Sequence, residues 1–142
     1  MAKLIKYYVR DALGKECVYE GFNANEADKI CRARNECCGD WWVDEEEVEG
    51  RYEIWALGYD KDEFVTDYEK FVGEYEDLDE AQEAFEEISR KKEEYLDLKN
   101  VPKEIHYIYL QLETIEDHGD WDENIETQME QHFERYRRGW RG

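Results

Sequence analysis

The sequence contains rows of closely spaced carboxylates, which are its most conspicuous chemical groups. The two rows with regular spacing are Asp44, Glu45, Glu46 and Glu47, and Glu83, Glu86, Glu87 and Glu94. Alternate residues of a β-strand lie about 6.6 Å apart, and residues four apart on a helix lie about 6 Å apart. Duplex DNA carries one phosphate per strand about every 3.4 Å of its axis. Such rows can therefore offer a groove lined by Lys and Arg the charge pattern that it meets on a nucleic acid.

A third acidic segment, residues 117–124, resembles a calcium-binding loop in its first half. Positions 1, 3 and 5 of such a loop would be filled by Asp120, Asp122 and Asn124. Position 6 is Ile125, where an EF-hand requires Gly, and position 12 is Gln131, where it requires Glu. We therefore exclude an EF-hand and assign no metal ligand, which leaves weak, nonspecific binding of divalent ions open. Asp120, Trp121 and Asp122 are instead predicted to contact a partner protein.

The histidines and glycines do not indicate a catalytic centre. No spacing places His106, His118 or His132 in a Ser-His-Asp or Cys-His arrangement. The sequence has neither a P-loop nor a G-x-G-x-x-G run. No enzyme and no cofactor are therefore expected. Because catalytic groups can also assemble in space, a metal-dependent or hydrolytic enzyme stays open as the least favoured alternative.

Four cysteines lie near the N-terminus: Cys17, Cys31, Cys37 and Cys38. They do not form two C-x-x-C pairs, and adjacent Cys37 and Cys38 cannot easily both ligate one tetrahedral zinc. The N-terminal segment turns polar at once, so no signal peptide is expected. No apolar run approaches the roughly 20 residues of a membrane helix. We therefore expect a cytoplasmic protein with reduced cysteines that serve as small buried side chains, and no contact with a membrane.

The net charge of −20 is concentrated in one part of the chain. Residues 1–39 hold six acidic and seven basic side chains, whereas residues 40–134 hold 33 acidic and eight basic ones. A protein with this much negative charge is not expected to bind nucleic acid directly, because it repels the phosphates. The last eight residues hold four Arg and no acid. This tail could contact phosphate and stack on bases, but we favour the alternative that it complements a helix C-terminus and folds onto the acidic body.

Hydrophobic periodicity places the structural elements. We expect a single folded domain, residues 1–142, because 41% of the residues are hydrophobic and 15% are aromatic. Alternation predicts strands at residues 3–11, 16–22, 41–47, 51–59, 64–75 and 104–116. Capping residues and 3.6-residue spacing predict helices from Asn23 or Asn25 to Asn35, at 78–98 and at 124–138. Glu49-Gly50 is expected to form a two-residue hairpin turn.

A weak internal repeat suggests how these elements combine. Residues 19–22 precede a helix start at Glu26-Ala27, as residues 72–75 precede one at Glu80-Ala81. The predicted fold class is therefore α+β, an antiparallel sheet with helices mostly on one face. It would consist of two ββαβ units plus a C-terminal helix. Its possible sub-units are the near-neutral, Cys-containing residues 1–48 and the acidic residues 49–142.

The size, charge and aromatic richness of the whole chain are similar to those of a class of small acidic inhibitors. Phages and mobile elements use these inhibitors against restriction or CRISPR nucleases, and several of them are DNA mimics. No motif matches, so no functional residue is carried over from any family. The resemblance implies a non-enzymatic inhibitor or regulator whose partner is a basic nucleic-acid-binding protein or nuclease complex. Exposed aromatic residues beside the acids would anchor the contact, and the candidates are Trp41, Trp42, Trp55, Tyr59 and Trp121.

The acidity could also arise without a nucleic-acid-handling partner. An acidic surface can simply keep a small protein soluble, and adaptation to high salt would also produce one. An acidic adaptor or oligomerisation module could bind a partner unrelated to nucleic acid. A nucleic-acid mimic should be displaced from its partner by DNA or RNA, whereas such an adaptor should not.

Overall fold

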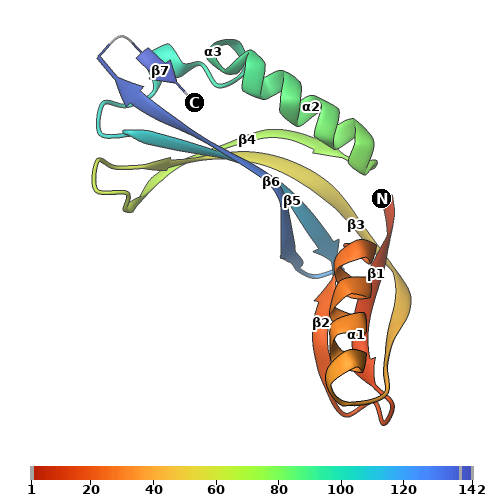
Figure 1. The fold of residues 1–142 in the computed structure, drawn as a ribbon. Helices are drawn as coiled ribbons and strands as arrows, with labels where there is room; N and C mark the ends of the chain where they lie inside the picture. Colours follow the sequence, from red (N-terminus) through yellow and green to blue (C-terminus); the bar gives the residue numbers. More distant parts are fainter. Residues whose placement is uncertain (1, 138, 142) are drawn as a thin grey trace.

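Strands dominate the computed structural model, which describes residues 2–137 and 139–141 and is 53% strand and 25% helix. The strands are β1 (Ala2–Asp11), β2 (Cys17–Gly21), β3 (Trp41–Tyr59), β4 (Val65–Tyr75), β5 (Tyr107–Asp117), β6 (Asp122–Tyr136) and β7 (Gly139–Arg141). The helices are α1 (Ala24–Cys38), α2 (Leu78–Arg90), the short α3 (Lys92–Tyr95) and the 3-10 turn η1 (Leu98–Asn100). All seven strands pair antiparallel in one sheet (Figure 1).

The 19-residue strand β3 is the axis of this sheet. Its first half pairs with β1 and its second half with β5, and Gly50 faces both of them. Tyr52 faces both β4 and β5, so β1 and β4 follow one another along the same side of β3. The sheet bends along β3 (Figure 1). We call β1, β2, α1 and residues 41–49 the arm, and the remaining elements the body.

The two main helices cover opposite faces of the sheet. Because side chains alternate along a strand, Ile54 of β3 faces α2, where it packs in one core with Phe85. Val43, of the other parity, packs on the opposite face against a second cluster that contains Ala27 of α1. Helix α1 lies on the arm and α2 on the body (Figure 1). In the described part of the chain, no helix covers the other face of either part of the sheet, and we call these two helix-free faces uncovered.

Of the two predicted caps of the first helix, Asn23 is the one used, and the second helix begins at Leu78 as predicted but ends at Arg90, short of the predicted residue 98. The Asn23 side chain accepts a hydrogen bond from the Glu26 N–H at 3.0 Å, and the Asp77 side chain accepts one from the Glu80 N–H at 3.1 Å. Each cap satisfies one N–H that the helix itself leaves without a partner. The strands predicted at residues 3–11, 16–22, 64–75 and 104–116 are also present. Within the described residues, none of the helices has the length and apolar character that a membrane-spanning segment requires.

The predicted α+β class is wrong, because the protein is mainly β and residues 124–138 do not form a helix. Ile125, Met129 and Phe133 recur at helical spacing, but they lie on strand β6. The pairing of β6 with β5 contains two register shifts, at which Ile125 and Gln128 are extra residues. Each bulge interrupts the alternation of β6 once, so the apolar spacing imitates a helix. Two ββαβ units do not form. Strand β3 is continuous across residue 48, where the two predicted sub-units would meet, and it therefore belongs to both the arm and the body.

The hairpin predicted at Glu49-Gly50 is also wrong, since β3 continues through these two residues without a turn. Gly50 is required there by crowding between three strands. A Cβ atom at this position would lie 2.3 Å from the Ile115 carbonyl oxygen and 2.6 Å from Leu4 Cδ1. The glycine therefore marks the point where β1, β3 and β5 meet.

Candidate functional site

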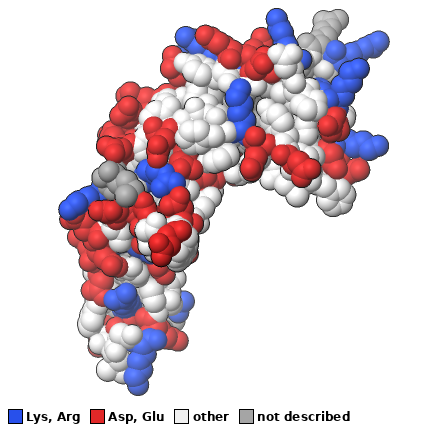
Figure 2. Space-filling model, turned by 180° about the vertical axis from the view of Figure 1, so that it is seen from behind, with Lys and Arg blue, Asp and Glu red and all other residues white. Residues whose placement is uncertain are grey.

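The acidic edge is a row of five carboxylates on β3, at the outer side of the arm: Asp44, Glu45, Glu46, Glu47 and Glu49. By the alternation of the strand, Asp44 and Glu46 lie on one face of the sheet and the other three on the opposite face. All are exposed except Asp44, which is partly buried. Figure 2 shows Asp and Glu side chains gathered along the outer side of the bend. The predicted residues 44–47 thus share one surface, which continues to Glu49.

Some side chains of the acidic edge have neighbours from β1. The Arg10 guanidinium lies 3.5 Å from Asp44, and the Lys3 ammonium lies 3.0 Å from Glu47. The Tyr8 hydroxyl donates a hydrogen bond to Glu46 at 2.6 Å. Burial, followed by this bond to an anion, raises the pKa of Tyr8 to about 12. Among the described residues, Glu45 and Glu49 make no ion pair within 4 Å.

The second predicted row lies on the helices of the body rather than on the arm. Three of its carboxylates are exposed, while Glu87 is half-buried and lies 3.6 Å from Lys91 Nζ. The exposed members are Glu83 and Glu86 of α2 and Glu94 of α3. The structure therefore gives two acidic surfaces on different elements instead of one continuous site. Residues 44–47 form the denser of the two.

The predicted residues 120–122 form the tip between β5 and β6. The Asp122 carboxylate lies 2.7 Å from the Arg51 guanidinium, which also binds Glu53 at 2.7 Å and Glu74 at 2.9 Å. A hydrogen bond from Arg51 holds the pKa of Asp122 below its ordinary value. Asp122 therefore ties the start of β6 to β3 although its side chain is itself exposed, and Asp120 is exposed as well.

The Trp121 ring at this tip stays accessible. It is 56% exposed and stacks on the His118 imidazole, with the ring centroids 4.1 Å apart. Among the other proposed anchors, Trp42 is exposed and Trp55 and Tyr59 are half-buried, but Trp41 is buried against α1. Trp41 is therefore a core residue, and the other aromatic side chains remain candidates.

A buried ion pair on the uncovered face of the arm has no signal in the sequence. Lys6 Nζ lies 2.7 Å from Glu116 Oε2 and 2.7 Å from Glu20 Oε1. Lys6 and Glu116 are only 4% and 6% exposed. Burial alone would lower the pKa of Lys6, but the hydrogen bonds with Glu116 and Glu20 raise it above its ordinary value. The pair fastens β1 to the end of β5.

Glu116 of this pair also belongs to a group of three side chains with the donor atoms of a metal site. The ligand atoms of Glu116, His118 and Glu123 lie within 4.8 Å of one another. His118 Nε2 is 3.1 Å from Glu123 and 3.7 Å from Glu116. The Glu116 oxygen is already bound by the Lys6 ammonium, which would repel a metal cation. The arrangement therefore fits an ion-pair network better than a metal site.

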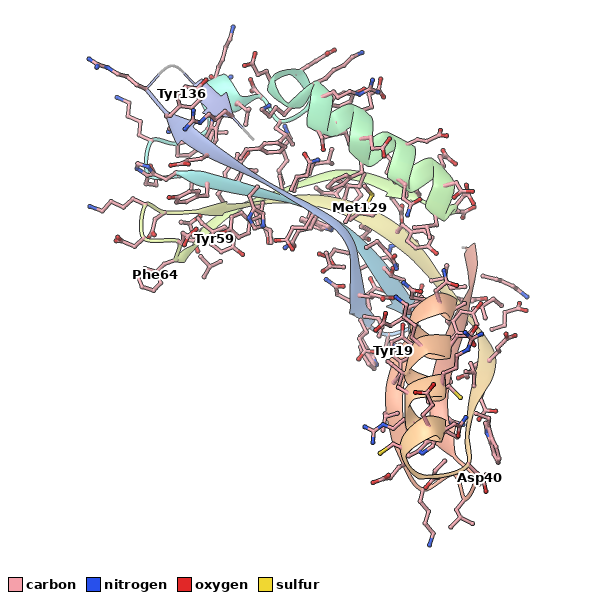
Figure 3. All side chains as sticks on the ribbon, in the orientation of Figure 1. Tyr19, Asp40, Tyr59, Phe64, Met129 and Tyr136 are labelled. Atoms are coloured by element: carbon pink, nitrogen blue, oxygen red, sulfur yellow. The ribbon has the colours of Figure 1, made fainter. Side chains whose placement is uncertain are left out.

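The uncovered face of the body is aromatic with an acidic rim. Tyr59, Tyr109 and His132 stack in a row across β3, β5 and β6, with centroids 4.2 Å and 3.7 Å apart. A hollow of about 210 Å³ beside them is lined by Glu63, Tyr107, Tyr109, His132, Glu134 and Arg141. Tyr59 and the exposed Phe64 lie on the side of the sheet away from α2 (Figure 3). The structure therefore adds an aromatic surface that sequence spacing does not reveal, because its members come from separate strands.

The basic C-terminal tail folds back onto the protein, but not as the end of a helix. Strand β7 pairs with the end of β6. The Arg135 guanidinium donates hydrogen bonds to the carbonyl oxygens of Val101 at 2.9 Å and Pro102 at 3.0 Å, and it lies 4.6 Å from the Trp140 ring centroid. The prediction that these arginines complement a helix dipole is therefore wrong. Arg138 and Gly142 lie outside the described residues.

The cysteines are less buried than predicted. Cys17 and Cys37 are exposed, and Cys31 is half-buried, with its Sγ 3.3 Å from the Trp41 carbonyl oxygen. These three thiols are free. The side chain of Cys38 lies outside the part of the chain that the structure describes.

Comparison of the chain with protein-family models, with curated proteins and with solved structures found no match. The acidic edge combines the highest local density of carboxylates with an accessible position on the arm.

Proposed function

We propose that this protein is a non-enzymatic inhibitor or regulator that binds a basic, nucleic-acid-handling protein through its acidic edge. The observation that carries the proposal is the placement of five carboxylates within six residues of one strand, on both faces of an accessible border. Carboxylates of one face repeat about every 6.6 Å. A partner that binds phosphates with Lys and Arg would meet two parallel rows of anions.

The net charge of −20 supports the same proposal. Long-range attraction between an acidic body and a basic cleft speeds encounter by orders of magnitude at low salt. At physiological salt the attraction is screened beyond about 8 Å. Carboxylates that project from the border of the arm can come within that distance of a partner's cations.

The internal ion pairs of the acidic edge do not prevent this contact. Lys3 and Glu47 are largely exposed, with side-chain exposures of 70% and 54%. Exposed pairs of this kind contribute between 0 and about 1 kcal/mol. Glu47 can therefore exchange Lys3 for a cation of the partner at small cost, and Glu45 has no ion pair to give up among the described residues.

A protein–protein adaptor unrelated to nucleic acid is the second candidate, and the uncovered aromatic face favours it. Phe64, Val65 and Phe71 are 68%, 74% and 49% exposed. Apolar exposure of this kind is typical of surfaces that bind another protein. An adaptor that uses this face would bind independently of the acidic edge.

The two candidates are separated by affinity capture from a lysate of the source cell, followed by mass spectrometry. We expect the wild-type protein to retain nucleic-acid-binding proteins, and duplex DNA or about 0.5 M salt to release them. Glu45→Lys/Glu46→Lys/Glu47→Lys should lose the captured proteins. Glu83→Lys/Glu86→Lys/Glu87→Lys changes the net charge equally and is the matched control. Capture that resists DNA and survives the first triple reversal would contradict the proposal and favour the adaptor.

A further inference from the structure

The first half of β3 is an open edge of the sheet. Residues 41–50 pair with β1 on one side. On the other side, β5 pairs with β3 only from Gly50 onward. β4 cannot fill this place, because it lies on the same side of β3 as β1. In the described part of the chain, therefore, no strand pairs with the outer side of residues 41–49.

Among the described residues, the backbone of this edge finds a partner only at its start. The Asn35 amide accepts a hydrogen bond from the Trp41 N–H at 2.7 Å and donates one to the Trp41 carbonyl oxygen at 3.0 Å. Asn35 thus takes the place that a neighbouring strand would occupy. In an antiparallel ladder, the N–H and C=O groups of one residue point to the same side, and those of the next residue point to the other. The backbone groups that face outward, beyond Trp41, therefore belong to Val43, Glu45, Glu47 and Glu49.

We propose that residues 43–49 of β3 bind an extended, basic segment of the partner protein as an added β-strand. This inference rests on the proposed function, because it names how the acidic edge would hold a basic partner. Main-chain hydrogen bonds would supply the alignment, as in other cases of strand addition. Carboxylates on both faces of β3 would meet cationic side chains on both faces of the added strand, since directly opposite side chains lie about 5 Å apart.

The charges of the edge select among the possible occupants. A second copy of this chain would place carboxylates opposite carboxylates, which is destabilising. Natural sheets use charged edges of this kind to prevent pairing between copies. A nucleic acid would bring phosphates against the same row. A cationic strand is the occupant that the charge of the edge attracts.

The experiment measures amide hydrogen exchange by NMR on the full chain, with two synthetic peptides as probes. One is the acetylated, amidated peptide (Arg-Val)5, and the other has the same composition but alternates L and D residues, so that it cannot form a regular strand. In the free protein, we expect the amides of residues 44, 46 and 48 to be protected by β1 and those of 43, 45, 47 and 49 to exchange quickly. The first peptide should slow exchange of the second set at least about tenfold, and the L/D peptide should not.

A pair of variants tests the backbone contribution separately from charge. Glu45→Pro and Glu45→Thr each remove one carboxylate, but only the proline removes the outward N–H. Proline at this position leaves the hydrogen bonds to β1 in place and is tolerated on edge strands. We expect Glu45→Pro to bind (Arg-Val)5 at least about tenfold more weakly than Glu45→Thr. Protection of residues 44, 46 and 48 reports whether each variant keeps the fold.

Three results would overturn the added strand: protection of both sets of amides in the free protein, equal effects of the two peptides, or equal binding by the two variants if they are folded. If Glu45→Pro and Glu45→Thr bind alike while the triple reversal at residues 45–47 abolishes capture of the partner, the added strand fails and the proposed function stands. If capture survives that reversal, the proposed function itself fails.

Discussion

Replacing Lys6 by Met should destabilise the protein strongly, because Lys6 is the cation of a buried ion pair. Its ammonium lies 2.7 Å from the Glu116 carboxylate, and both side chains are almost fully buried. Loss of one partner from such a pair costs about 3–5 kcal/mol, since the remaining charge stays buried without compensation. His118 still faces Glu116 at 3.7 Å. We therefore expect a loss of about 3 kcal/mol, at the lower end of this range.

The double variant Lys6→Met/Glu116→Leu separates the contribution of the ion pair to stability from that of side-chain packing at the same positions. Removing both charges should restore the free energy of unfolding to within about 1 kcal/mol of the wild type, because no uncompensated charge remains. Lys3→Met is the control, since the exposed pair of Lys3 and Glu47 should contribute less than about 1 kcal/mol. Urea unfolding at pH 7, followed by circular dichroism, measures all three. A double variant as unstable as Lys6→Met alone would refute this reasoning.

The pH dependence gives a second check on the same pair. Because the folded state raises the pKa of Lys6 above its ordinary value of 10.5, the ion pair contributes fully below pH 10.5. The contribution is lost as the pH rises through the raised value. The wild type should therefore lose more stability than Lys6→Met between neutral and strongly alkaline pH. Parallel losses in the two proteins would contradict the assignment.

Two further substitutions test the bend of the sheet and the tip between β5 and β6. Gly50→Ala should lose about 1–3 kcal/mol through overpacking against the Ile115 backbone. Gly73→Ala should lose less, because its nearest neighbour is the outer end of the Tyr75 side chain and not backbone. Equal losses in urea unfolding would show that the crowding at Gly50 is relieved. Because the pKa of Asp122 is lowered in the folded state, its contribution is present above the ordinary value of 3.8 and lost as the pH falls through the lowered value. Arg51→Met should remove this acid dependence, and unfolding curves between pH 2 and 5 that keep the wild-type slope would contradict it.

The elements that could be predicted from the sequence are those with strong local signals. The alternation of β5 and the Asp77 cap of α2 identify these elements without knowledge of the rest of the chain. β6 could not be predicted in the same way, because two bulges break its alternation and only its pairing with β5 fixes it as a strand. Gly50 is predicted to lie in a turn, because glycine is common there. In the structure, the close approach of Ile115 and Leu4 explains why this position is a glycine.

The candidate site shows the same division between local and long-range information. The run of carboxylates at residues 44–47 is visible in the sequence, and its alternation between two faces follows once the segment is a strand. The first half of this strand is an edge because β5 pairs with β3 only from Gly50 onward. The residue of β5 that pairs with Gly50 is Glu116, which lies far along the chain. The ion pair of Lys6 with Glu116 spans 110 residues, so no local pattern indicates it.

The most direct test of the central claim is the affinity of a captured basic partner for the wild type and for the two triple reversals, measured by calorimetry at two salt concentrations. If the acidic edge is the binding surface, the reversal at residues 45–47 should weaken binding at least about a hundredfold, and the reversal on α2 at residues 83, 86 and 87 much less. Binding by the wild type should weaken steeply as salt rises. Equal losses in both variants would show an effect of net charge alone, and unchanged binding by the first variant would remove the acidic edge from the contact.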